Sequence, residues 1–234
     1  MALIALAACG TARGSDKSRD SSAVAASHPE SKPTTPAAPA AAPAGRRTVL
    51  FVGTSLTAGL GLEPDSAFPM LIQRKLDSAG FDFEVVNAGV SGETSSGLID
   101  RLDWLLRGQF DVMVLETGAN DGLRGIPPAT LKANLERALV RIKAKRPDAR
   151  VILVQMEALP NLGPKYAREF HDVYPDIAKA TGVVLLPFLL NDVAGRRELN
   201  QGDGVHPNYA GERIVANNLW RALKPVLDST ASPR

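Results

Sequence analysis

The chain has 234 residues, which gives room for one domain of α/β size and an appendage. Its formal charge is +2, and its lysines and arginines show no basic stripe interleaved with aromatic residues, which argues against nucleic acid as a partner. Cys9 is the only cysteine, so the sequence excludes an intrachain disulfide and a cysteine-based metal site.

Residues 1–9 form a short apolar segment, too short to span a bilayer as a helix. Its end, Leu-Ala-Ala-Cys, resembles the lipobox of bacterial lipoproteins, in which the cysteine is lipidated and becomes the new first residue. No positive segment precedes the apolar run, which a start assigned too far downstream would explain. The resemblance implies lipidation of Cys9 and a tethered location in the periplasm of the bacterial cell envelope. The alternative is an Ala- and Leu-rich terminus that arose by chance.

Residues 10–45 have the composition of a linker. They contain no aromatic residue, and their prolines are interspersed with alanine, serine and threonine. Such a stretch cannot bury enough apolar surface to offset the entropy lost on ordering, so we predict a disordered tether. The folded domain is predicted over residues 46–230.

Thr48–Val52 is an uncharged run of strand-forming residues that ends at Gly53, which predicts a central parallel strand buried on both faces. Alternating strands and helices follow. Strands are predicted over 83–89, 111–118, 150–156 and 183–187, and helices over 67–78, 98–106, 128–142, 166–180 and 209–227. Residues 157–165 are predicted to form a loop because prolines and a glycine interrupt them.

This alternation predicts an α/β fold, a three-layer αβα sandwich around a five-stranded parallel sheet. The expected strand order is flavodoxin-like, 2-1-3-4-5. Strand one would then be interior, with the tips of strands one, two and three next to one another. That order brings Ser55, Gly89 and Asn120 to the same edge of the sheet.

A serine just past the end of a central strand lies where open α/β sheets bind their ligands, so Ser55 is a candidate nucleophile. Serine is also an ordinary turn and N-cap residue. A nucleophilic serine needs a base, and the chain has 3 histidines. His28 lies in the tether and His171 in a predicted helix. His206 lies in a turn with Asp203 three residues upstream, close enough to orient the imidazole.

Four short blocks, in this order, resemble the SGNH, or GDSL, hydrolase family over nearly all of residues 47–228. The blocks are Gly53-Thr54-Ser55-Leu56, Asn87-Ala88-Gly89, Gly118-Ala119-Asn120-Asp121 and Asp203-Gly204-Val205-His206. Segments 118–125 and 160–166 are similar to the bacterial periplasmic thioesterase, lysophospholipase and arylesterase group. The family usually has Asp where this chain has Thr54, so the resemblance does not predict the local hydrogen bond that the Asp would make.

The resemblance implies a role for each matching residue. Ser55 would be the nucleophile and would also donate its N–H to the oxyanion. Gly89 would donate a backbone N–H and Asn120 a side-chain N–H. His206 would be the base, oriented by Asp203. No cofactor or metal is implied.

The function implied is a serine esterase that hydrolyses acyl or aryl carboxyl esters, with thioesters and lysophospholipids as further small acyl or lipid substrates. One alternative is a carbohydrate O-deacetylase of the cell envelope, because a tether would hold the enzyme next to polymeric substrate. Another is a catalytically inactive binding module. That alternative requires the loss of a triad residue, and the sequence retains all of them.

Overall fold

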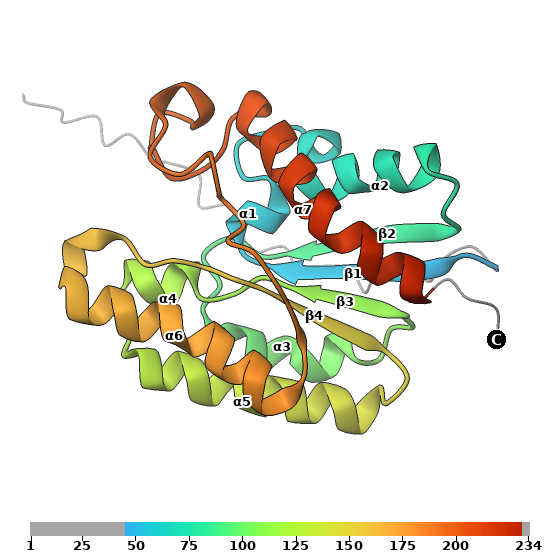
Figure 1. The fold of residues 1–234 in the computed structure, drawn as a ribbon, viewed down its shortest axis with the longest axis horizontal. Coiled ribbons are helices and arrows are strands. Elements are labelled where there is room, and N and C mark those ends of the chain that lie inside the picture. Colours follow the sequence, from blue (N-terminus) through green and yellow to red (C-terminus); the bar gives the residue numbers. More distant parts are fainter. Residues whose placement is uncertain (1–44, 231–234) are drawn as a thin grey trace, which may run out of the picture. The chain divides into compact units, whose positions relative to one another are not determined.

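The computed structural model describes residues 45–230 and contains a five-stranded parallel sheet (Figure 1). The strands are β1 (Arg47–Gly53), β2 (Phe83–Gly89), β3 (Val112–Leu115), β4 (Arg150–Val154) and β5 (Val184–Leu186). Their order is β2-β1-β3-β4-β5, which confirms the predicted topology. Cys9 and residues 10–44 lie outside the described residues, so lipidation and the tether stay predictions.

Helices cover both faces of the sheet. They are α1 (Ser55–Ala58), α2 (Phe68–Ser78), α3 (Ser95–Leu105), α4 (Ala119–Leu123), α5 (Pro128–Lys145), α6 (Gly163–Thr181) and α7 (Tyr209–Thr230). Short 3-10 turns are η1 (Pro64–Ser66), η2 (Pro160–Leu162) and η3 (Arg197–Leu199). Helices α2 and α7 pack together on one face, and α3, α5 and α6 pack on the other (Figure 1). No helix in residues 45–230 is long and apolar enough to cross a membrane.

Strand β1 forms the centre of the core, because its residues 49–52 are at most 2% exposed. In the register, Gly53 lies opposite Gly89 and Val52 lies opposite Leu115. The carboxyl ends of β1, β2 and β3 therefore meet at one edge. The chain leaves β1 for β2 in one direction and later builds β3, β4 and β5 in the other, so the topological switch point lies between β1 and β3.

Besides small shifts at element ends, the structure differs from the sequence-based elements in three main respects. Helices α1 and α4, of 4 and 5 residues, were not predicted because they are too short to show a helical period. Helix α6 begins at Gly163 rather than Tyr166, with a proline in its first turn, where proline is tolerated. Strand β3 ends at Leu115 rather than at residue 118, so Glu116 lies beyond the ladder.

A buried carboxyl group joins the two helices on the first face. Glu212 of α7 is 2% exposed, and its Oε2 accepts the N–H of Phe68, the first residue of α2, at 2.7 Å. Burial raises the pKa of Glu212 to about 8, against an ordinary value of 4.5, although the hydrogen bond from Phe68 opposes the rise. Protonated Glu212 is therefore the form that the folded chain favours at neutral pH.

We expect Glu212→Gln to raise the melting temperature at pH 9 by about 3 °C or more, and to change it little at pH 5. Between the unfolded and folded pKa values the folded chain binds more protons, so the wild type loses stability as pH rises from about 4.5 to about 8. Glutamine still accepts the Phe68 N–H but carries no charge. Thermal unfolding from pH 5 to 9 measures the effect, with exposed Glu136→Gln as control. If Glu212→Gln destabilised the protein relative to wild type more at pH 9 than at pH 5, the assignment of Glu212 as a buried acid with a raised pKa would be contradicted.

Candidate active site

Ser55 is the first residue of α1, two residues past the carboxyl end of β1 at Gly53, and it is buried. Thr54 caps this helix, because its Oγ1 accepts the N–H of Leu56 at 3.4 Å. Gly59 ends the helix with φ 71°, a left-handed conformation that suits glycine. The N–H of Ser55 has no hydrogen-bond partner among residues 45–230, as is usual at the first position of a helix. It is therefore available to an anion.

A buried acid, Glu116, supports the turn that carries the serine. It accepts the N–H of Thr54 at 2.8 Å, the hydroxyl of Thr54 at 3.0 Å and the hydroxyl of Thr57 at 2.9 Å. Burial raises the pKa of Glu116, and these hydrogen bonds oppose the rise. A Cβ on Gly53 would lie 2.0 Å from Thr57 Oγ1 and 2.6 Å from Glu116 Oε2, which explains the glycine. The hydroxyl of Thr54 thus keeps a local hydrogen bond at the position where the family usually has Asp.

His206 and Asp203 lie in the loop before α7. Asp203 Oδ1 accepts the N–H groups of Val205 at 2.9 Å and His206 at 3.0 Å. Asp203 Oδ2 lies 2.7 Å from His206 Nδ1. The backbone hydrogen bonds from His206 and Val205, followed by the imidazole contact, lower the pKa of Asp203 to about 2. Asp203 therefore stays ionised at neutral pH and holds the proton of the imidazole on Nδ1.

The same imidazole reaches the serine. His206 Nε2 lies 2.8 Å from Ser55 Oγ, across 151 positions of sequence. With the Nδ1 proton directed to Asp203, Nε2 is the lone-pair nitrogen that accepts the serine proton. The structure thus brings together the three residues that the sequence predicted as nucleophile, base and orienting acid.

Asn120 lies in α4, at the adjacent end of β3. Its Nδ2 donates to the carbonyl of Glu93 at 2.9 Å, and the amide has a second N–H, which has no partner in residues 45–230. Gly118, rather than a side chain, occupies the N-cap position of α4, so Asn120 does not cap its own helix.

Gly89 is placed less favourably than the sequence predicted. Its N–H donates to Asn87 Oδ1 at 3.0 Å, and Asn87 Nδ2 donates to the carbonyl of Thr57 at 2.8 Å. A Cβ on Gly89 would meet the backbone of Ala58 at 2.3 Å, so the close approach of α1 to β2 already requires glycine there. Packing therefore explains this glycine, and its N–H is occupied.

Gly92 was not singled out from the sequence. Its N–H has no hydrogen-bond partner within residues 45–230, and its φ of 78° suits glycine. Its carbonyl accepts Arg124 Nη2 at 3.0 Å, and the next carbonyl, that of Glu93, accepts Asn120. The signal in the sequence was a Ser-Gly-Glu-Thr loop after a strand, which is ordinary turn chemistry.

Buried polar groups hold the loop that carries Gly92. Asp121 accepts the N–H of Ser95 at 2.8 Å and also its hydroxyl, and Asn134 donates to the same hydroxyl at 2.9 Å. The side chain of Glu93 pairs with Arg101. Buried and satisfied networks of this kind fix backbone positions. Helix α4 therefore positions both its own Asn120 and the 92–95 loop.

His171 belongs to a different cluster. Its Nδ1 lies 2.7 Å from Glu157 Oε1, and Gln155 Nε2 lies 3.2 Å from its carbonyl. Its side chain is 53% exposed. No hydrogen bond in the described chain joins it to Ser55 or Asp203, which agrees with its sequence-based interpretation as a helix histidine.

An oriented serine and imidazole at the switch point of a parallel α/β sheet define a serine hydrolase. Residues 51–214 match the GDSL-like Lipase/Acylhydrolase family, and the chain belongs to that family.

Individual proteins agree with this assignment. Esterase TesA of Pseudomonas aeruginosa is 40% identical over 79% of this chain and 91% of its own length. Thioesterase 1/protease 1/lysophospholipase L1 of Escherichia coli is 36% identical over 77% of this chain and 85% of its own length. The crystal structure of the psychrotrophic esterase EstA from Pseudoalteromonas sp., inhibited by monoethylphosphonate, has a TM-score of 0.74 and 33% identity, covering 78% of this chain and 99% of that one. The protein is a carboxyl-ester hydrolase of the serine type.

Proposed function

We propose that Ser55, His206 and Asp203 hydrolyse esters through an acyl-enzyme. The Ser55 Oγ to His206 Nε2 distance of 2.8 Å is the observation that carries this proposal. His206 takes the hydroxyl proton as Ser55 Oγ bonds to the carbonyl carbon. The carbon–oxygen bond to the leaving group then breaks, and His206 gives the alcohol its proton. Water, deprotonated by His206, attacks the acyl-enzyme and releases the acid and the serine.

The negative oxygen of each tetrahedral intermediate needs donors. We propose the N–H of Ser55, the side chain of Asn120 and the N–H of Gly92, in place of the predicted Gly89. The hydrogen bonds support this choice. The N–H groups of Ser55 and Gly92 have no partner in residues 45–230, and Asn120 has one N–H without a partner there. Gly89, by contrast, already donates its N–H to Asn87. Donors without a partner require no reorganisation when charge develops.

The substrates we propose are acyl and aryl esters with an apolar acyl chain, with thioesters as a second group. Exposed leucines lie close to α4 and support this: Leu123 is 49% exposed and Leu162 is 38% exposed. The segment that carries Leu162 lies against α4 and the turn that follows it. A Cβ built on Gly122 would lie 3.6 Å from Ala158, and one built on Gly125 would lie 3.7 Å from Leu162. A deacetylase would act on an acetyl group, which is too small to use this apolar surface. We therefore place the envelope deacetylase second. Rates on p-nitrophenyl esters of rising chain length beside acetylated sugars separate the two.

We expect a fluorophosphonate to add once to the wild type and not at all to Ser55→Ala. Only Ser55 has its hydroxyl within hydrogen-bond distance of His206 among the described serines. Intact mass spectrometry counts the adducts, and peptide mapping locates them. An adduct that persisted on Ser55→Ala would remove Ser55 as the nucleophile.

We further propose that Cys9 is lipidated and that the enzyme is anchored at the cell envelope. The lipobox-like residues 6–9 and the tether composition support this proposal. When the native gene is expressed in a bacterium, wild type should fractionate with membranes and Cys9→Ser should not. Equal distribution of the two proteins would remove the anchor.

A further inference from the structure

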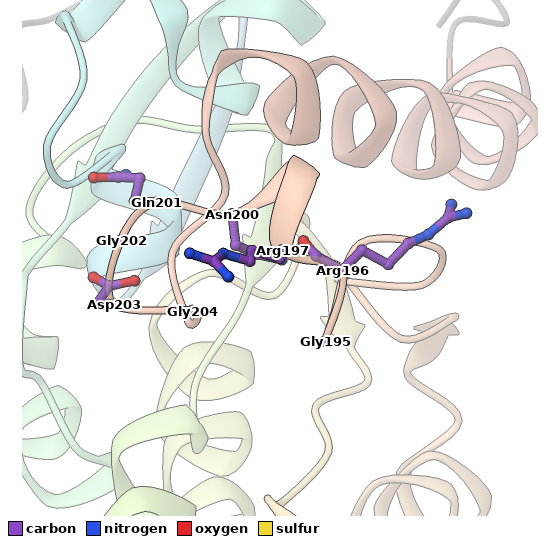
Figure 2. Close-up of a pocket in the computed structure, with 8 residues that line it drawn as sticks. All are labelled: Gly195, Arg196, Arg197, Asn200, Gln201, Gly202, Asp203 and Gly204. Atoms are coloured by element: carbon purple, nitrogen blue, oxygen red, sulfur yellow. Dashed lines mark hydrogen bonds between the residues drawn. The ribbon is translucent and has the colours of Figure 1, made fainter.

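A cavity of about 460 Å³ lies beside the acid of the triad (Figure 2). It is lined by residues 195–197 and by residues 200–204, which include Asp203. Asp203, which lines the cavity, is joined to Ser55 through the imidazole of His206. The mechanism proposed above uses none of the other residues that line it.

Two arginines border this cavity, and their surroundings differ. Arg196 has its Nε 3.5 Å from Glu198 Oε1 and donates from Nη1 to the carbonyl of Asp192 at 3.3 Å. Arg197 has no hydrogen bond or ion pair from its side chain within residues 45–230. Figure 2 shows its guanidinium directed toward the 201–204 turn, whereas that of Arg196 extends away from the turn. Arg197 is thus the uncompensated cation at the cavity.

Asp203 does not neutralise Arg197. Both oxygens of Asp203 accept hydrogen bonds from His206, and one accepts a further bond from Val205. The hydrogen bonds from the backbone of His206 and Val205, followed by the His206 imidazole, are the main causes of the lowered pKa of Asp203. A positive charge with no partner beside a cavity favours an external anion.

We propose that Arg197 binds a phosphate group of the substrate, and so favours phosphate-bearing esters or thioesters over neutral ones. The inference rests on the proposed triad. A guanidinium matches phosphate oxygens with two parallel N–H donors. In a lysophospholipid the phosphate follows the ester across one glycerol unit, a short span suited to a cavity next to the triad. The same chemistry occurs in the phosphates of coenzyme A thioesters.

The test uses the full chain and two matched substrate pairs below their critical micelle concentrations. The first pair is 1-decanoyl-lysophosphatidylcholine and 1-decanoylglycerol, which share the acyl group and the glycerol. The second is decanoyl-coenzyme A and the decanoyl thioester of N-acetylcysteamine, which lacks the phosphates. We expect Arg197→Gln to lower kcat/KM about tenfold for a phosphate-bearing member and to leave its neutral partner within about twofold. Arg196→Gln, the matched control, should leave both members within about twofold.

Each result decides the proposal. A selective loss in the glycerol pair alone, in the thioester pair alone or in both supports it and identifies the phosphate source. Equal losses on phosphate-bearing and neutral members, or no loss in either pair, would overturn it. Ser55→Ala, measured on the neutral esters, reports on the triad separately. Activity that survived in that variant would defeat the proposed mechanism, whatever Arg197→Gln shows.

Discussion

His206→Ala is expected to lower kcat on a p-nitrophenyl ester by about 10³-fold or more, because triad residues act as a unit. The variant removes the group that accepts the proton of Ser55 at 2.8 Å, and it leaves Asp203 with no imidazole to orient. His171→Ala should change kcat by no more than about a few-fold. Release of p-nitrophenolate at saturating ester gives both values.

His171 is a matched control, because it too has a carboxylate, that of Glu157, 2.7 Å from its Nδ1. Both histidines therefore have an acid partner, and what distinguishes His206 is the serine hydroxyl at its Nε2. Melting temperatures of both variants show whether a loss comes from unfolding. A large loss in His171→Ala together with a small one in His206→Ala would mean that the triad has been assigned to the wrong loop.

The sequence predicted the sheet well because each strand is short and has an apolar centre, and because the longer helices between the strands show a clear apolar period. The run 48–52 is the strongest case, since burial on both faces allows no alternation of polar residues. Helices α1 and α4 were missed for a physical reason. One turn of helix is held by its caps and by neighbouring segments, as Thr54 and Glu116 show, and not by its own periodicity.

The triad was predictable because a nucleophile, a base and an acid differ in chemical type and are few. The oxyanion donors were not equally predictable. A backbone N–H has no side chain to mark it, so Gly89 and Gly92 look alike in the sequence. What separates them is the Asn87 side chain, which accepts the N–H of Gly89 at 3.0 Å. Glu116 was also missed, because an acid at a strand end normally faces solvent.

Asn120 has a structural interpretation that the hydrogen bonds can now test. An asparagine in a turn of this type often caps the nearby backbone. Here its Nδ2 donates across to the carbonyl of Glu93 at 2.9 Å, on the loop that carries Gly92. One N–H of Asn120 therefore holds that loop, and we propose that the second, which has no partner within residues 45–230, donates to the oxyanion.

We expect Asn120→Ala to lower kcat by about 10²- to 10³-fold with little change in KM. A donor directed at the developing oxyanion stabilises the transition state far more than the bound ester, so the loss falls on kcat. Ester hydrolysis over a range of substrate concentrations separates the two constants, and thermal unfolding reports stability.

The loop effect has its own control in Asn134→Ala. Asn134 is 8% exposed and donates to the hydroxyl of Ser95 at 2.9 Å, so it supports the same loop. We expect this variant to lose stability but to keep kcat within about tenfold. Equal losses of kcat in both variants would reduce Asn120 to a loop anchor.

A crystal of the phosphonylated enzyme then locates the donors, because the phosphonyl oxygen stands in for the oxyanion. That oxygen should lie about 3 Å from Asn120 Nδ2 and from the backbone nitrogens of Ser55 and Gly92. Contact with the nitrogen of Gly89 instead would return the role to the residue predicted from the sequence.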